Sequence, residues 1–285
     1  MIKIPFKTGL TIQRIGSIRP SDWLRIAKAL ELEHLEFDLT VFDDIDNVLE
    51  VGRTGQTAIH SPYIEDYGID LSTDKPAVRS FIDNVNEYRK VMNIKYVVVH
   101  PPNDPDGSLE MFLNNLNALN SFILLENMPW QSWKDFEAIF SVVRDYKANN
   151  IGFCFDIPHS FVTHGENFLE LPINLLEMVK SYDGYIHISG GLKNADTHLP
   201  LVTDGDIPFN RVRSFLKSFK GSVTMELKPR NIEEIDKIIQ SYKIMLGISG
   251  KKWLFLKTSA KERMVMKKIR ALAAKHAVSS LDRTV

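Results

Sequence analysis

Nine residues of the chain have side chains that bind divalent metals, and most of them directly follow a short apolar run. They are His60, His100, Glu126, Asp156, His159, His187, Asp196, His198 and Glu226. Imidazole and carboxylate ligands suit Zn²⁺, and they also bind Mn²⁺, Fe²⁺ and Co²⁺. Any one of these residues alone is better explained as a hydrogen-bonding residue at the end of a strand. Nine together at one edge of a sheet cannot easily satisfy one another without a positive charge between them. The set therefore predicts a metal centre.

Three of the nine residues lie close together in the segment 185–201. This segment begins as a short apolar strand that contains His187, breaks at Gly190 and Gly191, and continues as a loop-like stretch with Asp196 and His198. A strand with an incidental histidine and a polar loop is the alternative interpretation. The choice between them depends on whether the other strands also end in ligand residues, and each of the last six predicted strands ends in His, Asp or Glu.

The alternation of short apolar runs and amphipathic stretches predicts repeated βα units. Strands are expected near 8–12, 35–38, 57–60, 96–100, 122–126, 151–156, 184–188 and 222–227. Helices are expected near 20–32, 44–51, 75–92, 109–119, 133–148, 167–181, 210–219 and 231–246. Eight such units favour a single α/β domain folded as a (β/α)8 TIM barrel, in which the carboxyl ends of the strands form the active site. An open doubly wound sheet is the alternative, but no Gly-rich phosphate loop follows the first strand to support it.

The composition is that of an ordinary soluble protein. The chain has 285 residues, of which 44% are hydrophobic and 25% are charged. No apolar run approaches the roughly 20 residues that cross a bilayer, and the first residues do not look like a secretory signal. A single cysteine, Cys154, excludes an internal disulfide framework. These features predict a cytoplasmic location and no membrane partner.

The charges are distributed unevenly along the chain. Residues 246–285 contain ten Lys and Arg against two acidic residues, whereas residues 1–245 contain 25 basic and 34 acidic residues. We therefore expect a barrel over residues 1–245 and a basic helical C-terminal extension over residues 246–285. A solvated helix packed across the outside of the barrel is the favoured interpretation of this extension. A dimer contact, a nucleic-acid contact and a contact with an anionic membrane are the alternatives.

The candidate ligands at the strand ends carry a family resemblance. The chain resembles the xylose isomerase-like TIM-barrel superfamily, also called AP endonuclease family 2. That superfamily contains endonuclease IV-type nucleases and sugar or sugar-phosphate isomerases and epimerases. The resemblance covers about residues 8–245, and every metal-ligand position of the endonuclease IV pattern is occupied here.

The resemblance implies a role for each of the nine residues. One metal would be held by His60, His100 and Glu126. Glu126 would also bridge to a second metal held by Asp156, His187 and Glu226, and a third metal would be held by His159, Asp196 and His198. The isomerase branch needs only the second of these sets, around one ion, and there Glu126 and Glu226 also transfer the substrate proton. We accordingly expect two or three Zn²⁺ ions, with Glu126 and Glu226 as catalytic residues.

Two reaction classes fit this ligand set. The full set favours hydrolysis of a phosphate ester, because an isomerase does not need the third group. Departures from the nuclease pattern favour a small substrate instead: Asn127 follows the glutamate of the fifth strand, and Asp43, Asp44 and Asp46 would repel DNA phosphates. The sequence interpretation is an isomerase or epimerase of a sugar or sugar phosphate. The alternatives are a zinc phosphodiesterase that cleaves DNA at abasic sites and a metal-stabilised binding protein without turnover.

Several further residues are candidates for substrate contact or support. Trp130 and Trp133 could wall a sugar-sized pocket, and Tyr63 could be a wedge or stacking residue, although packing explains these aromatic residues equally well. Lys228 could bind a substrate phosphate or carboxylate, or it could only balance the charge of the ligand carboxylates. Glu36 and Asp38 are expected to support metal-bound histidines through hydrogen bonds. Cys154 is expected to be a core thiol, His34 to be solvated, and His164 not to be a ligand.

Overall fold

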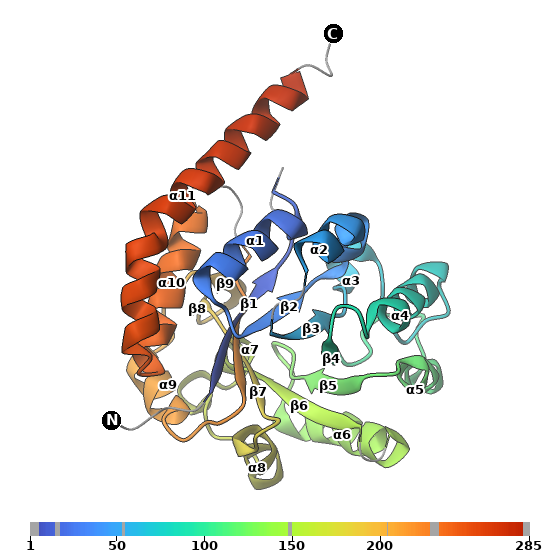
Figure 1. Cartoon of the computed structure of the whole chain (residues 1–285). Helices are drawn as coiled ribbons and strands as arrows, with labels where there is room; N and C mark the ends of the chain where they lie inside the picture. Colours follow the sequence, from blue (N-terminus) through green and yellow to red (C-terminus); the bar gives the residue numbers. More distant parts are fainter. Residues whose placement is uncertain are drawn as a thin grey trace.

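Eight parallel strands close into a barrel (Figure 1). The computed structural model describes residues 6–14, 18–52, 55–147, 150–203, 205–228 and 234–281. The barrel strands are β1 (Lys7–Ile12), β2 (His34–Phe37), β3 (Gln56–His60), β4 (Ile94–Val99), β5 (Phe122–Glu126), β6 (Ile151–Asp156), β7 (Tyr185–Ile188) and β10 (Ser222–Met225). Each strand pairs in parallel with its neighbours, and β10 closes the ring between β7 and β1. The expected (β/α)8 barrel is confirmed, and every strand boundary lies within two residues of its expected position.

Helices surround the barrel and follow the strands along the chain. The long ones are α1 (Pro20–Leu30), α2 (Ile45–Val51), α4 (Pro76–Tyr88), α5 (Leu109–Ala118), α6 (Trp133–Lys147), α8 (Ile173–Lys180), α9 (Phe209–Leu216) and α10 (Glu234–Ile248). The short ones are the 3₁₀ turns η1 (Leu39–Asp44) and η2 (Gly165–Asn167) and the helix α3 (Ile64–Tyr67). The amphipathic helices pack their apolar faces on the strands, and buried Phe81, Phe112 and Phe140 belong to this outer layer of the core.

Two of the differences from the sequence expectation concern segments that carry candidate site residues. The helix α7 (Ile157–His164) begins directly after β6, because the side chain of Asp156 caps it by accepting a hydrogen bond from the backbone N–H of His159. The expected helix at 167–181 is accordingly shorter and begins at Ile173. In place of the expected loop after β7, the chain forms a hairpin of two antiparallel strands, β8 (Gly190–Leu192) and β9 (Ala195–Leu199).

The inside of the barrel is partly polar. A small apolar layer there includes Tyr96, Leu124, Cys154 and Tyr185, so the prediction of a core thiol at Cys154 is confirmed. The expectation that His34 is solvated is wrong. Its ring is fully buried inside the barrel, where Nε2 lies 2.5 Å from the hydroxyl of Tyr185.

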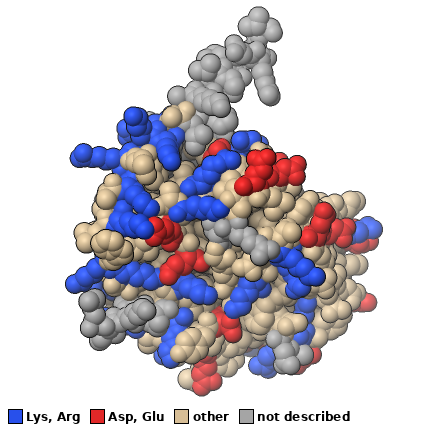
Figure 2. All heavy atoms as spheres, in the orientation of Figure 1, with Lys and Arg blue, Asp and Glu red and all other residues tan. Residues whose placement is uncertain are grey.

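The basic C-terminal segment forms one long helix, α11 (Lys252–Leu281). Its first half packs against α1 and α10, and its far half extends beyond them (Figure 1). Val265 is 1% exposed at this contact, while Lys257 and Lys261 form ion pairs with Glu31 of α1. Lys and Arg side chains are numerous over α10 and α11 (Figure 2). The expected helical extension packed on the outside of the barrel is confirmed. Among the described residues, no helix is long and apolar enough to cross a membrane.

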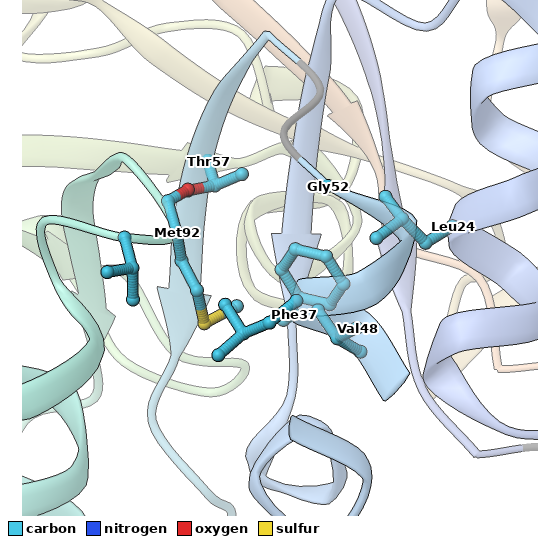
Figure 3. Close-up of a pocket in the computed structure, with 8 residues that line it drawn as sticks. Leu24, Phe37, Val48, Gly52, Thr57 and Met92 are labelled. Atoms are coloured by element: carbon cyan, nitrogen blue, oxygen red, sulfur yellow. The ribbon is translucent and has the colours of Figure 1, made fainter. Parts of the chain in front are cut away.

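A cavity of about 320 Å³ lies between α1, α2 and the barrel wall. Leu24, Phe37, Val48 and Met92 line it (Figure 3), and the rest of its lining has no ionisable side chain. It lies outside the ring of strands, whereas the nine candidate ligands lie at the carboxyl ends of the strands. This cavity is therefore a gap in the outer layer, apart from the candidate ligands.

Candidate metal centre

The nine candidate ligands all lie at one end of the barrel. His60, Glu126 and Asp156 are the last residues of their strands, and His187 is next to last in β7. Two more, His100 and Glu226, directly follow β4 and β10; the remaining three are His159 on α7 and Asp196 and His198 on β9. The closed parallel sheet brings these sequence-distant residues together, because all eight strands end at the same rim.

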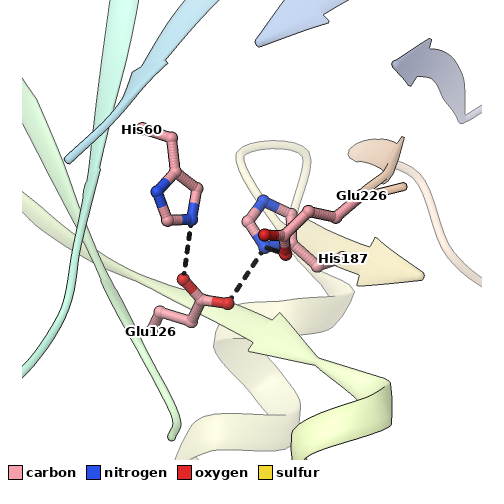
Figure 4. Close-up of side chains that lie close together, drawn as sticks. All are labelled: His60, Glu126, His187 and Glu226. Carbon is pink, nitrogen blue, oxygen red and sulfur yellow. Dashed lines mark hydrogen bonds and ion pairs between the residues drawn. The ribbon is translucent and has the colours of Figure 1, made fainter. Parts of the chain in front are cut away.

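Glu126 is the central carboxylate of the cluster. Its Oε2 lies 3.1 Å from Nε2 of His60 and 3.3 Å from Nε2 of His100, and its Oε1 lies 3.0 Å from Nδ1 of His187 (Figure 4). The side chain is fully buried, which by itself would raise its pKa. The adjacent imidazoles outweigh burial and hold the pKa of Glu126 well below its usual value. Glu126 therefore remains a carboxylate and can share its two oxygens between neighbouring ligand sets.

His187 is held between carboxylates on both sides. Its Nε2 lies 2.9 Å from Oε2 of Glu36, while its Nδ1 lies 3.0 Å from Oε1 of Glu126 and 3.0 Å from Oε2 of Glu226. An ionised carboxylate only accepts hydrogen bonds, so Nε2 must donate to Glu36. Nδ1 then faces two carboxylate oxygens, and these acceptors need either a proton or a cation between them. The carboxylates accordingly raise the pKa of His187 well above its usual value, against the opposing effect of burial.

His159, Asp196 and His198 form a second group beside the first. Nδ1 of His159 lies 2.8 Å from the carbonyl oxygen of Asn127, to which it donates, and its Nε2 lies 3.3 Å from Oδ2 of Asp196. Nε2 of His198 lies 3.1 Å from the same carboxylate. His198 has a φ of 42°, a left-handed conformation that is uncommon for residues other than glycine and is retained where the surroundings impose it.

Several atoms of the nine residues are buried without a hydrogen bond among the described residues. They are Nε2 of His100, Oδ2 of Asp156, Oδ1 of Asp196, Nδ1 of His198 and Oε2 of Glu226. Each of these atoms lies 3.0–3.8 Å from another candidate ligand without a hydrogen bond to it. A buried polar atom without a hydrogen bond costs on the order of 1–3 kcal/mol, so five in one site call for a cation that accepts their lone pairs. All five can carry a lone pair toward a cation. The donor set therefore fits a divalent metal of the kind that binds nitrogen and oxygen ligands.

Eight of the nine candidate ligands fall into three overlapping groups, in each of which the ligand atoms lie within 4.8 Å of one another, and His100 belongs to none of them. One group is His60, Glu126, His187 and Glu226; the second is Glu126, Asp156 and His159; the third is His159, Asp196 and His198. The third group has the membership that the family resemblance implied. His60, however, belongs to the group with Glu126 and the other central ligands, although its ring also lies beside that of His100. Glu126 and His159 each belong to two groups and therefore join them.

The candidate substrate residues divide into two sets. Tyr63 and Lys228 lie at the cluster: the Tyr63 hydroxyl donates to Oε1 of Glu226 at 2.5 Å, and Nζ of Lys228 lies 3.7 Å from the centre of the Tyr63 ring. Both line a small cavity beside Glu226. Trp130 lies elsewhere, with 70% of its surface exposed and no part in this cavity. The structure thus brings Tyr63 and Lys228 to the cluster and leaves Trp130 apart from it.

Supporting residues lie behind the candidate ligands. Glu36 contacts His187 as expected, whereas Asp38 accepts from Thr40 and Tyr67 and, among the described residues, has no hydrogen bond with a candidate ligand. Sequence reasoning missed Asn127 as a support. Its side chain bridges to the backbone of Asp156 at 2.9 and 3.0 Å, which ties the ends of β5 and β6 together. The signal was its place directly after Glu126.

Comparison with known proteins shows which family the chain belongs to. Residues 24–246 match the family described as xylose isomerase-like TIM barrel. The chain belongs to this family. An uncharacterized protein of Methanocaldococcus jannaschii is 27% identical over 229 residues, which are 73% of this chain and 85% of that protein.

Several solved structures share the fold of this chain at low sequence identity. D-psicose 3-epimerase from Clostridium cellulolyticum H10, solved with D-tagatose, is 14% identical with a TM-score of 0.53, covering 92% of this chain and 99% of the epimerase. An AP endonuclease of family 2 from Brucella melitensis is 14% identical with a TM-score of 0.55, covering 80% of this chain and 94% of the other. A xylose isomerase-like protein from Rhodospirillum rubrum is 12% identical with a TM-score of 0.58, covering 83% and 96%. At these identities the likeness is evidence for the fold alone.

Proposed function

We propose that the protein is a divalent-metal-dependent isomerase or epimerase of a small sugar or sugar phosphate, with its active site at the mouth of the barrel. One observation carries this proposal. Glu126 and Glu226 each place a carboxylate oxygen 3.0 Å from the same atom, Nδ1 of His187. Isomerisation or epimerisation needs one group that removes a proton from a substrate carbon and another that returns a proton to the substrate. Two buried carboxylates that face the same point can fill these two roles.

The proposed metal ligands are the nine residues named above, with Glu126, Asp156, His187 and Glu226 as the central set. A divalent metal bound there would act as a Lewis acid on adjacent substrate oxygens and so acidify the C–H between them. Glu126 is held by imidazoles on both oxygens. Glu226 is held on Oε1 by the Tyr63 hydroxyl, which leaves Oε2 directed at the cluster. The two carboxylates are therefore fixed in place before any substrate arrives.

Lys228 is the proposed contact for an anionic group of the substrate. It follows Glu226 by two residues, and its ammonium group lies over the face of Tyr63 at the mouth. A cation in this position would bind a phosphate or carboxylate while the sugar hydroxyls face the metal ligands. Neutralising Lys228 should therefore weaken binding of sugar phosphates more than binding of the unphosphorylated sugars.

Hydrolysis of a phosphate ester is the second candidate, and a specific observation favours it. Oδ2 of Asp196 lies 3.3 Å from Nε2 of His159 and 3.1 Å from Nε2 of His198. Proton transfer at the central set does not require this group. Additional metals stabilise the oxygens of a phosphate ester during its displacement. Nicking of a DNA duplex with a single abasic site, and turnover of a small phosphodiester, measure this activity directly.

The test of the first candidate is exchange of solvent deuterium. The purified protein is loaded with Mn²⁺, Co²⁺ or Zn²⁺ and incubated in D₂O with a panel of ketoses and ketose phosphates, and mass spectrometry measures the deuterium taken up at carbon. We expect exchange with the wild-type protein and loss of exchange in Glu226→Gln, which keeps the shape but not the charge. The control is Glu110→Gln, because Glu110 is exposed on α5. Exchange that is absent throughout the panel, together with nicking of abasic DNA, would replace the first candidate by the second.

A further inference from the structure

A column of hydrogen-bonded polar side chains runs through the barrel beneath the candidate metal centre. We define the interior column as His34, Tyr185, Glu36 and His187, in the order in which they contact one another. Nε2 of His34 lies 2.5 Å from the Tyr185 hydroxyl, which lies 2.6 Å from Oε2 of Glu36. The same Glu36 oxygen lies 2.9 Å from Nε2 of His187. All four side chains are fully buried.

The strand register places these residues in two layers. His34 and Glu36 alternate on β2, and Tyr185 and His187 alternate on β7, so each pair points to the same side of its strand. His34 and Tyr185 are the first residues of their strands and form the lower layer, whereas Glu36 and His187 lie one layer nearer the mouth. The column therefore joins the lower end of the barrel to a proposed metal ligand.

The direction of each hydrogen bond in the column follows from the donors that are present. Burial lowers the pKa of His34 to about 4, so its ring is neutral and has a single N–H. The Tyr185 hydroxyl has one proton, which it donates to Glu36, and its oxygen accepts from Thr224 at 3.0 Å. His34 must then donate to the same oxygen through Nε2. Every proton in the column points toward Glu36, and Glu36 in turn accepts from Nε2 of His187.

Burying these four polar side chains costs folding free energy, so their presence calls for an explanation. The interiors of such barrels are usually filled by bulky apolar side chains, and each buried polar group here needs a partner. Gly9 of β1 makes room for the column, because a Cβ atom at that position would lie 2.6 Å from Cδ2 of His34. Apolar residues would fill this space at lower cost, so the benefit of the column lies in what it does to His187.

We propose that Tyr185 and His34 are positioning residues for the metal centre: they fix Glu36, and Glu36 fixes His187 with its Nε2–H inward and its Nδ1 directed at the metal. The inference rests on the proposed metal centre but not on which reaction it performs. Partners that orient a ligand histidine typically change metal affinity by about 10–100-fold. The column would extend this effect to residues two hydrogen bonds away from the ligand.

The experiment compares metal affinity in Tyr185→Phe and Tyr96→Phe. Tyr96 belongs to the same interior layer and its ring contacts Tyr185, but its hydroxyl donates to Asp183 outside the column. The probe is Co²⁺ alone, titrated into the metal-free protein and followed by visible absorption, with Zn²⁺ affinity measured by competition. Melting temperatures of the metal-free variants are measured in parallel, because a purely structural role would lower these and leave the affinity unchanged.

We expect Tyr185→Phe to weaken Co²⁺ and Zn²⁺ binding by about tenfold or more and to change the Co²⁺ absorption spectrum, while Tyr96→Phe binds as the wild-type protein does. The effect of Tyr185→Phe should largely disappear in a Glu36→Gln background, because the two residues act on His187 in series. Equal affinities for Tyr185→Phe and the wild-type protein would overturn the inference, and so would an equal loss in Tyr96→Phe.

A second pair of variants covers the case in which Tyr185→Phe does not fold. His34→Gln keeps a donor near the place of Nε2, and His34→Leu removes it. We expect His34→Leu to weaken metal binding and His34→Gln to restore it; equal affinities in the two variants would contradict a role for His34. A wild-type protein that binds neither Co²⁺ nor Zn²⁺ would overturn the proposed metal centre and the inference with it, whereas binding that is insensitive to both pairs would overturn the inference alone.

Discussion

Three histidines of the cluster each have one ring nitrogen bound to an acceptor of the protein. Nδ1 of His60 lies 2.7 Å from the carbonyl oxygen of Ser61, Nδ1 of His159 lies 2.8 Å from that of Asn127, and Nε2 of His187 lies 2.9 Å from Glu36. A nitrogen that donates to the protein leaves the other nitrogen of the neutral ring available as a ligand. At the scale of single residues, the hydrogen bonds behind the cluster therefore select the atoms that face it.

The two candidate reactions make different demands on the group at β9. In the double variant Asp196→Ala/His198→Ala, we expect the protein to lose one bound metal per chain, measured by elemental analysis. An isomerase should keep most of its kcat/KM, because the central set is intact. A phosphate-ester hydrolase should lose about a hundredfold or more, because the stabilisation of developing charge is removed.

The control for this experiment is Thr197→Val, which changes the residue between the two ligands without removing a candidate ligand. Metal content that is unchanged in the double variant would contradict the assignment of Asp196 and His198 as ligands. Loss of deuterium exchange in the double variant would contradict an isomerase that uses the central set alone.

At the scale of elements, α7 and the β8–β9 hairpin bring the second group of ligands over the barrel mouth. The Asp156 side chain caps α7 through the N–H of His159, so one candidate ligand fixes the start of the helix that carries another. His198 reaches the cluster from β9 with a left-handed backbone. These two elements add His159, Asp196 and His198 to what eight strand ends alone would supply.

The helix α11 offers a test of its docking on the barrel. Val265 is 1% exposed and its neighbour Met264 is 48% exposed. We expect Val265→Asp to lower the free energy of unfolding by roughly 3 kcal/mol, because it buries an unpaired carboxylate, and Met264→Asp to have little effect. Thermal denaturation measures the difference. Equal melting temperatures for the two variants would show that the contact of α11 with α1 and α10 does not contribute to stability.

At the scale of the whole molecule, the barrel gathers buried charge at one end and the metal would neutralise it. Removing the metal with a chelator should therefore lower the melting temperature. A ligand present at a thousand times its dissociation constant stabilises a protein by about 4 kcal/mol. Differential scanning calorimetry of the metal-loaded and chelated protein measures this change, and readdition of Zn²⁺ should reverse it. A melting temperature that is insensitive to both treatments would contradict the metal centre.

Metal binding should also release protons. Without metal, neighbouring carboxylates outweigh burial and raise the pKa of His60 to about 9 and that of His159 to about 10. Both rings are then protonated at pH 7.5, and a protonated imidazole cannot bind a metal. Metal affinity should rise as the pH increases toward 9, with release of more than one proton at pH 7.5. Calorimetric titrations in buffers of different ionisation enthalpy measure this release; a binding enthalpy that is independent of the buffer would contradict it.

The sequence by itself determined the barrel and the identity of the candidate ligands. Apolar strands such as Tyr96-Val-Val-Val and Phe122-Ile-Leu-Leu mark segments buried on both faces, and six of the nine candidate ligands lie where such a run stops. Local pattern also predicted the C-terminal helix. It did not predict α7 or the β8–β9 hairpin, because a short capped helix and a short hairpin have too few residues to show a period.

Only the tertiary structure decided how the ligands group and what supports them. His34 lies in a polar stretch and looks solvated from the sequence, yet the closure of β1 against β2 buries it beneath Tyr185. Trp130 follows Glu126 closely in the chain but is exposed, whereas Tyr63 is far from Glu226 in the sequence and bonds to it. The physical reason is that the sequence pattern of a strand indicates only which residues are buried. The partner of each buried group depends on strand register and barrel closure, which bring together residues more than a hundred positions apart in the sequence.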